Sequence, residues 1–258
     1  MTELQKIAVL IDADNTQLSK IGAVLQEIST HGRIVVKRAY GNWRKDGLKN
    51  WETELKRLAI KAEQQFDYVS GKNATDMALV IDTIELLYSN IYDAFVIVSS
   101  DSDYTPLAIK LHESGVYVMG VGEKKTPDSF RNACDEFIFL ENLSATTSAT
   151  ADKEESDDPA APDIVHHVIP ASKADINEIH DLLHKAFDTY QDDDSYVNVA
   201  QAGNFIKRAK PDFDCRSFGY TKLMHLLEAF PDRYEVAQYQ GKGTIPIVGY
   251  KCIEKTSD

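Results

Sequence analysis

Residues 6–140 alternate short apolar runs with longer segments of helical periodicity, and this alternation restricts the chain to one class of fold. Apolar runs without polar residues at every second position are typical of strands buried on both faces of a sheet. We predict such strands at 6–11, 34–36, 67–69, 94–98, 117–121 and 137–140, with helices at 17–31, 48–65, 75–90 and 105–114. This order predicts an α/β fold, a doubly wound, mostly parallel sheet with helices on both faces.

Two of the predicted helices carry local signals. Thr105 is a good N-cap residue for the last of them, and Pro106 suits its first turn. In the helix at 75–90, apolar residues recur every three or four positions and are expected to form one apolar face. They are Met77, Val80, Ile81, Ile84, Leu87 and Tyr88.

The composition changes after residue 143. Residues 144–173 combine a Ser/Thr/Ala-rich stretch, an acidic run at 152–158 and a proline-bounded segment at 159–162. Since the segment has no apolar periodicity and its acidic residues repel one another, we predict a flexible acidic linker. The linker would separate a first domain, residues 1–143, from a second, residues 174–258.

The second domain shows the pattern of a small winged-helix fold. Asp175 and Glu178 have the spacing of a capping box at the start of a helix. Two short helices are expected around 199–207 and 219–229, and two strands at 234–238 and 244–250 would flank a turn at 241–243. Helices followed by a hairpin give a winged-helix-like domain.

Whole-chain features narrow the class of protein. No apolar run approaches the roughly 20 residues of a membrane span, and the N-terminus lacks the features of a signal peptide. The three cysteines have no metal-binding spacing, and their odd number favours reduced thiols in a cytoplasmic protein. The net charge of −13 argues against nonspecific nucleic-acid binding by the whole molecule.

Acidic residues follow three of the predicted strands. Asp12 ends the first strand, Asp76 opens the helix after the third, and Asp101 and Asp103 follow the strand at 94–98. Ligands of an open α/β sheet bind beyond the carboxyl ends of its strands, so these carboxylates are expected to share one crevice. Clustered carboxylates repel unless a cation lies between them, and oxygen-only ligands suit Mg²⁺ or Mn²⁺. Asn15 would add a neutral ligand or position a phosphate.

Other chemistry has less support. None of the seven histidines joins the acidic set, and the chain has no Gly-x-Ser-x-Gly motif and no phosphate-binding Walker loop. Catalysis by a nucleophilic serine or cysteine is therefore poorly supported. Lys72, between the third strand and Asp76, would neutralise a nearby phosphate or be an ordinary surface lysine.

These motifs resemble those of a known family. Ile11-Asp12-Ala-Asp-Asn15, Lys72 with Asp76 and Leu79, and Ser99-Ser-Asp-Ser-Asp-Tyr104 are similar to the NYN family, LabA-like members included. The family belongs to the PIN-like nucleases, and the resemblance extends over residues 5–142. It implies a metal-dependent ribonuclease in which Asp12, Asp76, Asp101 and Asp103 hold Mg²⁺ or Mn²⁺ beside Asn15.

The second domain has a resemblance of its own. Phe213 with Phe218-Gly219-Tyr220, behind a small basic cluster, is similar to the OST-HTH (LOTUS) domain over about residues 175–252. The resemblance implies RNA binding or docking to a protein partner. Candidate contact residues are Lys207, Arg208, Lys210 and Lys222.

A basic segment in the first domain offers a place for RNA. Residues 33–61 contain nine basic and only three acidic residues, with Tyr40, Trp43 and Trp51 among them. Basic side chains hold the RNA backbone and aromatic faces stack on unpaired bases. We expect Trp43 to be exposed; the simpler interpretation is a solvated helix face with Trp51 in the core. The candidate contacts are Arg38, Trp43, Arg44, Lys45 and Lys49.

Two alternatives remain open. Asp12-Ala-Asp14-Asn-Thr16 also fits the start of a haloacid-dehalogenase-type phosphatase, with Asp12 as nucleophile and Asp14 as general acid. The non-enzymatic alternative is an RNA-binding adaptor with a vestigial metal site. A pure binder gains nothing from clustered negative charge facing phosphates, which favours the ribonuclease.

Overall fold

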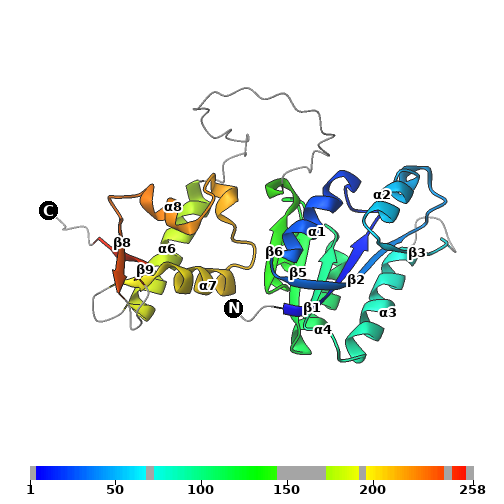
Figure 1. Ribbon diagram of the computed structural model, residues 1–258, viewed down its shortest axis with the longest axis horizontal. Coiled ribbons are helices and arrows are strands. Elements are labelled where there is room, and N and C mark those ends of the chain that lie inside the picture. The colour runs from blue at the N-terminus through cyan, green and yellow to red at the C-terminus, as the bar shows by residue number, and fades with distance from the viewer. Residues whose placement is uncertain (1–3, 68–72, 144–172, 192–195, 241–245, 254–258) are drawn as a thin grey trace, which may run out of the picture. The chain divides into compact units, whose positions relative to one another are not determined.

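A computed structural model describes residues 4–67, 73–143, 173–191, 196–240 and 246–253 of the chain (Figure 1). The chain divides into two compact units, residues 1–152 and 153–258. Residues 144–172 of the predicted linker lie outside the described residues, and its last residue, Lys173, begins a helix. No described helix combines the length and apolar character needed to span a membrane.

The N-terminal unit is built on six parallel strands, which confirms the predicted fold class. The strands are β1 (Leu4–Asp12), β2 (Gly32–Gly41), β3 (Lys61–Gln64), β4 (Ala94–Val98), β5 (Tyr117–Gly122) and β6 (Glu136–Phe139). Their order in the sheet is β3-β2-β1-β4-β5-β6, so the direction of winding reverses between β1 and β4. Ligand sites of such sheets lie at the carboxyl ends of the strands where this reversal occurs.

Helices cover both faces of this sheet (Figure 1). On one face lie α1 (Ile21–Ser29) and α2 (Trp51–Arg57); on the other lie α3 (Ala74–Tyr88), α4 (Thr105–Glu113) and α5 (Asp128–Asn132). Every residue of β4 and most of β1 are buried, as expected for apolar strands between two helical layers. Short 3₁₀ turns complete the unit: η1 (Leu18–Lys20), η2 (Asp46–Leu48), η3 (Ser102–Tyr104) and η4 (Leu140–Asn142).

The predicted helix at 48–65 is wrong in its second half. The helix α2 ends at Arg57, and the chain turns back into β3. Ala59 takes a left-handed conformation with φ 51°, and the amide of Ile60 donates to the carbonyl of Leu55. The edge strand therefore lies at 61–64, not at the predicted 67–69, of which residues 68 and 69 fall outside the described residues.

The apolar face marked by the sequence of α3 is not the face that packs on the sheet. The buried residues of α3 are Thr75, Leu79, Thr83 and Leu86. Met77, Ile81 and Tyr88 are among the exposed large hydrophobic residues, and the other three predicted positions are half-buried. Because α3 is apolar on most of its circumference, hydrophobic periodicity does not identify its inner face.

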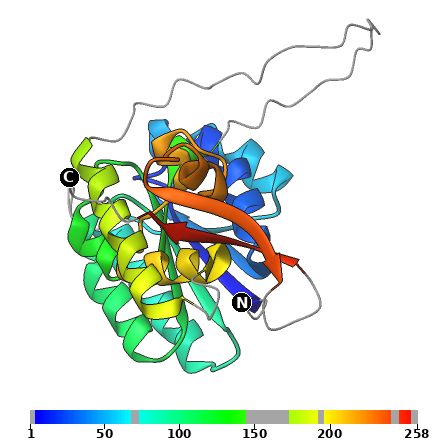
Figure 2. The ribbon, with the colours of Figure 1, turned by 90° about the vertical axis from the view of Figure 1, so that its left-hand side faces the viewer.

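The C-terminal unit is the predicted winged-helix-like domain. Its elements are α6 (Lys173–Tyr190), β7 (Val197–Asn198), α7 (Val199–Ala209), η5 (Cys215–Phe218), α8 (Leu223–Glu228), β8 (Tyr234–Gln240) and β9 (Pro246–Cys252). The hairpin of β8 and β9 (Figure 2) joins β7 in an antiparallel sheet of order β7-β9-β8. Asp175 lies in the first turn of α6 rather than capping it, and the turn at 241–243 is outside the described residues.

Candidate active site

Asp12 is the buried centre of the acidic group at the reversal point of the sheet. It is the last residue of β1 and has 0% exposure. Its Oδ2 accepts hydrogen bonds from Asn15 Nδ2 (2.8 Å) and Ser99 Oγ (2.9 Å), and its Oδ1 accepts one from the Asn15 amide (3.3 Å). Since Ser99 follows β4, this network ties together the ends of the two strands that flank the reversal point.

Asp76 approaches the same place from the helical layer. It lies in the first turn of α3, and its Oδ1 accepts a hydrogen bond from the hydroxyl of Tyr104 at 2.9 Å. The Tyr104 ring is buried, and burial raises the pKa of its hydroxyl far above the ordinary range, so the hydroxyl stays a donor. One oxygen of Asp76 is thus held by the protein.

Asp101 and Asp103 lie on the connection that follows β4. Asp101 caps η3 by accepting a hydrogen bond from the Asp103 amide at 2.9 Å, and its own amide donates to Ser99 Oγ. Asp103 is exposed and accepts a hydrogen bond from Asn73 Nδ2 at 3.2 Å. Asp103 is thus the exposed member of the group, and Asp101 is half-buried.

The carboxylates lie close enough to influence one another. Burial raises the pKa of Asp12, and the charge of Asp76 raises it further, against the hydrogen bonds from Asn15 and Ser99. Burial also raises the pKa of Asp76, and the charges of Asp101, Asp14 and Asp103 add to that effect. A cation bound between these carboxylates would reduce the electrostatic repulsion among them.

The donor set of this group fits a hard divalent cation. All of its charged donors are carboxylate oxygens, which suit Mg²⁺ or Mn²⁺. Within the described ranges, however, no three His, Cys, Asp or Glu side chains already form a group able to hold a metal. Binding an ion would therefore require the more exposed carboxylates to move toward it.

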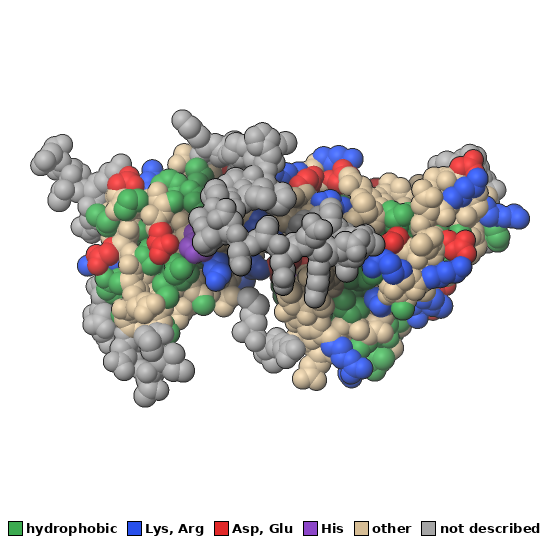
Figure 3. Space-filling model, turned by 45° about the horizontal axis from the view of Figure 1, so that its top comes forward, with side chains coloured by type: hydrophobic (Ala, Val, Ile, Leu, Met, Phe, Trp, Pro, Cys, Tyr) green, Lys and Arg blue, Asp and Glu red, His purple; other side chains and the backbone are tan. Residues whose placement is uncertain are grey.

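Most Lys and Arg side chains of the basic segment, residues 33–61, form ion pairs with acidic side chains. Arg38 of β2, a predicted RNA contact, forms an ion pair with Asp82 of α3. Lys49 pairs with Asp46 at 2.7 Å. The same holds on α2, where Lys56 pairs with Glu52 and Arg57 with Glu54. Figure 3 shows Lys and Arg side chains interleaved with Asp and Glu side chains on the right-hand side of the view. The excess of positive charge in the sequence is thus partly neutralised in the structure.

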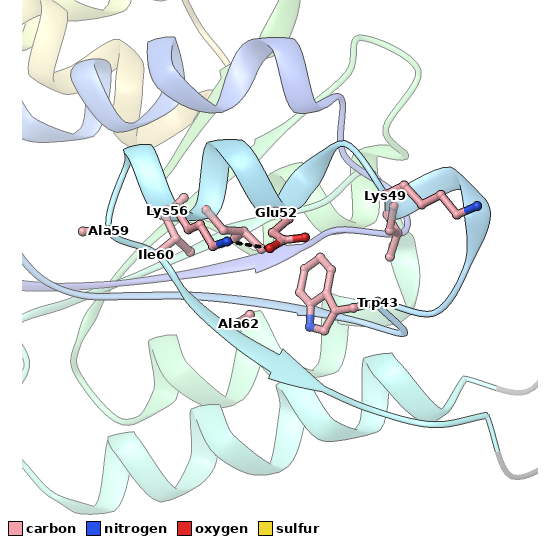
Figure 4. Close-up of a pocket in the computed structure, with 9 residues that line it drawn as sticks. Trp43, Lys49, Glu52, Lys56, Ala59, Ile60 and Ala62 are labelled. Carbon is pink, nitrogen blue, oxygen red and sulfur yellow. Dashed lines mark hydrogen bonds and ion pairs between the residues drawn. The ribbon is translucent and has the colours of Figure 1, made fainter.

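Trp43 is half-buried, not exposed as expected, because its ring contacts other residues. The indole nitrogen donates to the carbonyl of Glu63 at 3.1 Å, and the ring lies 6.0 Å from that of Trp51. Trp43 forms one wall of an open crevice of about 630 Å³ between α2 and β3 (Figure 4). Its other lining residues are Leu48, Lys49, Glu52, Leu55, Lys56, Ala59, Ile60 and Ala62.

Arg44 and Lys45 follow Trp43 in the chain and make contacts outside this crevice. Lys45 Nζ is 3.3 Å from both carboxylate oxygens of Asp14 and 3.5 Å from Asp67 Oδ2. The Arg44 guanidinium lies 5.6 Å from the centre of the Phe66 ring. Lys45 thus lies near Asp14, whose charge acts on Asp76, whereas Arg44 packs over Phe66.

The remaining predicted contacts are dispersed. Lys72 lies outside the described residues. In the C-terminal domain, Lys207 and Arg208 lie in the last turn of α7, and Lys222 precedes α8. Lys210 forms an ion pair with Glu178 at 2.9 Å.

Three side chains of the site were not singled out from the sequence. Ser99 and Tyr104 lie inside the motif that carries the resemblance, and only their contacts with Asp12 and Asp76 reveal their part in the site. Phe66 gave little signal, because it lies directly after the predicted helix at 48–65. Its proximity to the predicted strand at 67–69 was the one available indication.

Comparisons with known proteins agree with this architecture. The family model of the NYN domain matches residues 6–141, and that of the OST-HTH/LOTUS domain matches residues 172–246. NYN domains are PIN-like nucleases, which generally use divalent metals, and OST-HTH/LOTUS domains bind RNA or proteins. No curated protein matches the chain.

Two solved structures are similar to part of the chain. A protein of unknown function from Vibrio parahaemolyticus is 15% identical, with a TM-score of 0.45 over 54% of this chain and 94% of its own. An uncharacterized protein from Nitrosomonas europaea is 21% identical, with a TM-score of 0.31 over 41% of this chain and 96% of its own. By its sequence match and its fold, the chain belongs to the NYN domain family and carries a C-terminal OST-HTH/LOTUS domain.

Proposed function

We propose that the N-terminal domain is a metal-dependent ribonuclease that hydrolyses phosphodiester bonds of single-stranded RNA. The observation that supports it most is the grouping of acids around the fully buried Asp12, where the winding of the sheet reverses. Burial is the main cause of the raised pKa values of Asp12 and Asp76, and the charges of neighbouring acids raise both pKa values further. A protein that only binds RNA has no use for such repulsion next to phosphates.

In this proposal Asp12, Asp76, Asp101 and Asp103 hold one or two Mg²⁺ or Mn²⁺ ions. Bound there, the metal would lower the pKa of a water molecule and stabilise charge on the scissile phosphate. Asn15 acts through Asp12, because its side-chain amide donates to that carboxylate. Ser99 fixes Asp12 from the adjacent strand, so the buried carboxylate is oriented before RNA arrives.

The C-terminal domain would deliver a substrate or a partner to this site. Tethering a second binding module raises its effective concentration near the catalytic rim. Lys207, Arg208 and Lys222 are its proposed RNA contacts, and a protein partner is the alternative for this domain. The three cysteines are free, which fits a cytoplasmic protein.

The first test replaces the central acid. Asp12→Asn is expected to abolish Mn²⁺- or Mg²⁺-dependent cleavage of single-stranded RNA, because it removes the charge that the metal needs while keeping the shape. Circular dichroism should show an unchanged fold. Glu113→Gln is a matched control: Glu113 is an exposed acid at the end of α4 farther from the rim, and it should leave cleavage unchanged.

Substrate choice separates the ribonuclease from its alternatives. The wild-type chain should cleave a labelled single-stranded RNA only when a divalent metal is present. Release of phosphate from a generic monoester without RNA cleavage would support the phosphatase and contradict our proposal. RNA binding without cleavage in any divalent metal would support the adaptor.

A further inference from the structure

Phe66 is an exposed aromatic residue two positions after β3, at the carboxyl edge of the sheet on which the acids also lie. Its side chain is 52% exposed, although the chain on either side of it is held in place. The Gln65 amide donates to the carbonyl of Gly41 at 3.1 Å, and Asp67 accepts a hydrogen bond from Asn42 at 3.2 Å. The ring is thus presented to solvent from a backbone that is fixed against the end of β2.

A cation lies over one face of this ring. The Arg44 guanidinium is 5.6 Å from the centre of the Phe66 ring and forms no ion pair with any residue in the described part of the chain. Most other cations of the basic segment are paired with acids, whereas the Arg44 guanidinium is available to contact an anionic ligand. An aromatic face next to an uncompensated guanidinium suits a group that is both planar and anionic.

This pair is continuous with the proposed catalytic group. Lys45, next to Arg44, reaches Asp14 at 3.3 Å and Asp67 at 3.5 Å, and the charge of Asp14 raises the pKa of Asp76. Phe66 follows β3 by two residues, so a ligand on it lies at the same carboxyl edge of the sheet as the acids. Among the described residues of this domain, the other exposed large aromatic residue is Tyr88, at the opposite end of α3, roughly 18 Å from Asp76 along the helix axis.

We propose that Phe66 and Arg44 form a stacking platform for one unpaired base of the RNA next to the cleavage site. The face of the Phe66 ring away from Arg44 would stack on the base, and Arg44 would contact the adjacent phosphate. Trp43 is less suited to this role, because its ring packs near Trp51 and its indole nitrogen is already bonded. This inference rests on the proposed ribonuclease function and names the residues that position the RNA strand.

Affinity for RNA without metal tests the platform independently of catalysis. The full chain would be titrated into fluorescently labelled oligouridylate in EDTA, followed by anisotropy. Phe66→Leu should weaken binding at least about fivefold, because one stacked base is lost, and Phe66→Trp should restore it. Tyr88→Leu, which removes an exposed ring far from the rim, should bind as the wild type does.

An RNA series with a single abasic site distinguishes stacking from a general loss of structure. At one position in the oligonucleotide, the abasic site should weaken binding by the wild type. Phe66→Leu should bind that abasic RNA as tightly as it binds the intact RNA. Equal affinity of Phe66→Leu and wild type for intact RNA, or failure of Phe66→Trp to recover it, would overturn the platform. If wild type cleaves RNA in that case, only the platform is wrong; if wild type neither binds nor cleaves RNA, the ribonuclease is wrong as well.

Discussion

At the scale of single residues, the acids of the site depend on uncharged side chains that hold them. The Tyr104 hydroxyl donates to Asp76 Oδ1, and the Ser99 hydroxyl donates to Asp12 Oδ2. Such partners fix the direction in which a carboxylate presents its free oxygen to a metal. Tyr104 is therefore expected to matter for metal affinity although it would not touch the ion.

Removing this hydroxyl should weaken metal binding without unfolding the domain. Tyr104→Phe keeps the buried ring and leaves Asp76 without its donor. We expect the affinity for Mn²⁺ to fall about 10- to 100-fold, measured by titration calorimetry in the absence of RNA. Tyr117→Phe is a matched control, since Tyr117 is a half-buried tyrosine that donates to Glu136 at 3.0 Å from the opposite end of the sheet. Equal losses in both variants would contradict a specific role for Tyr104.

The sequence predicted the charged residues of the site better than their partners. Asp12 and Asp101 follow uninterrupted apolar strands, so their place at a sheet edge could be inferred from chain order alone. Contacts between distant segments, such as Tyr104 with Asp76, depend on side-chain packing and have no periodic signal. For Trp43 the expectation was wrong for the same reason. A tryptophan in a loop was expected to be exposed, but its ring lies near Trp51 and its indole nitrogen donates to the carbonyl of Glu63.

At the scale of elements, the boundary between α2 and β3 shows what periodicity alone could not predict. The helix ends at a left-handed residue with a hydrogen bond from Ile60 to Leu55, an ending that is usually marked by glycine. Here Ala59 occupies that position with φ 51°. Without the glycine signal, the sequence of residues 48–65 looked like one helix.

Placing glycine at this turn should stabilise the N-terminal domain. An alanine in the left-handed region is strained, and Ala59→Gly is expected to raise the free energy of unfolding by about 0.5–1 kcal/mol. Both tryptophans of the chain, Trp43 and Trp51, lie in this domain, so their fluorescence in a urea titration reports its unfolding. The control Ala78→Gly, inside α3, should lower the free energy by about 1 kcal/mol. A loss of stability in both variants would show that Ala59 is not strained.

At the scale of the whole molecule, the net charge of −13 does not exclude RNA binding by one part of the chain. Part of the negative charge is concentrated in the acidic group of the N-terminal domain, where the proposed metal would offset it. The two domains were predictable because each has its own hydrophobic pattern, and each has its own core in the structure. Separate cores predict that the domains respond separately to conditions such as pH.

The C-terminal domain should lose stability on mild acidification because of one buried histidine. His180 is buried, its Nδ1 lies 2.8 Å from the Tyr234 hydroxyl, and its ring packs edge-on against Phe230. Burial lowers the pKa of His180 below its ordinary value of 6.5, and the charges of Arg233 and His184 lower it further, with Asp181 and Asp232 opposing them. In the unfolded chain the imidazole takes up a proton near its ordinary value, so the unfolded state binds more protons in this window.

Stability contributed by neutral His180 is therefore fully present above pH 6.5 and is lost as the pH falls through the lowered value. Calorimetry of the full chain between pH 7.5 and about pH 5 should show the C-terminal transition moving to lower temperature, while tryptophan fluorescence identifies the N-terminal one. His180→Gln should make that shift smaller whatever its effect at pH 7.5. His225→Gln, which replaces an exposed histidine of the same domain, should leave the shift unchanged. An identical shift in wild type and His180→Gln would mean that other groups govern the acid response of the domain.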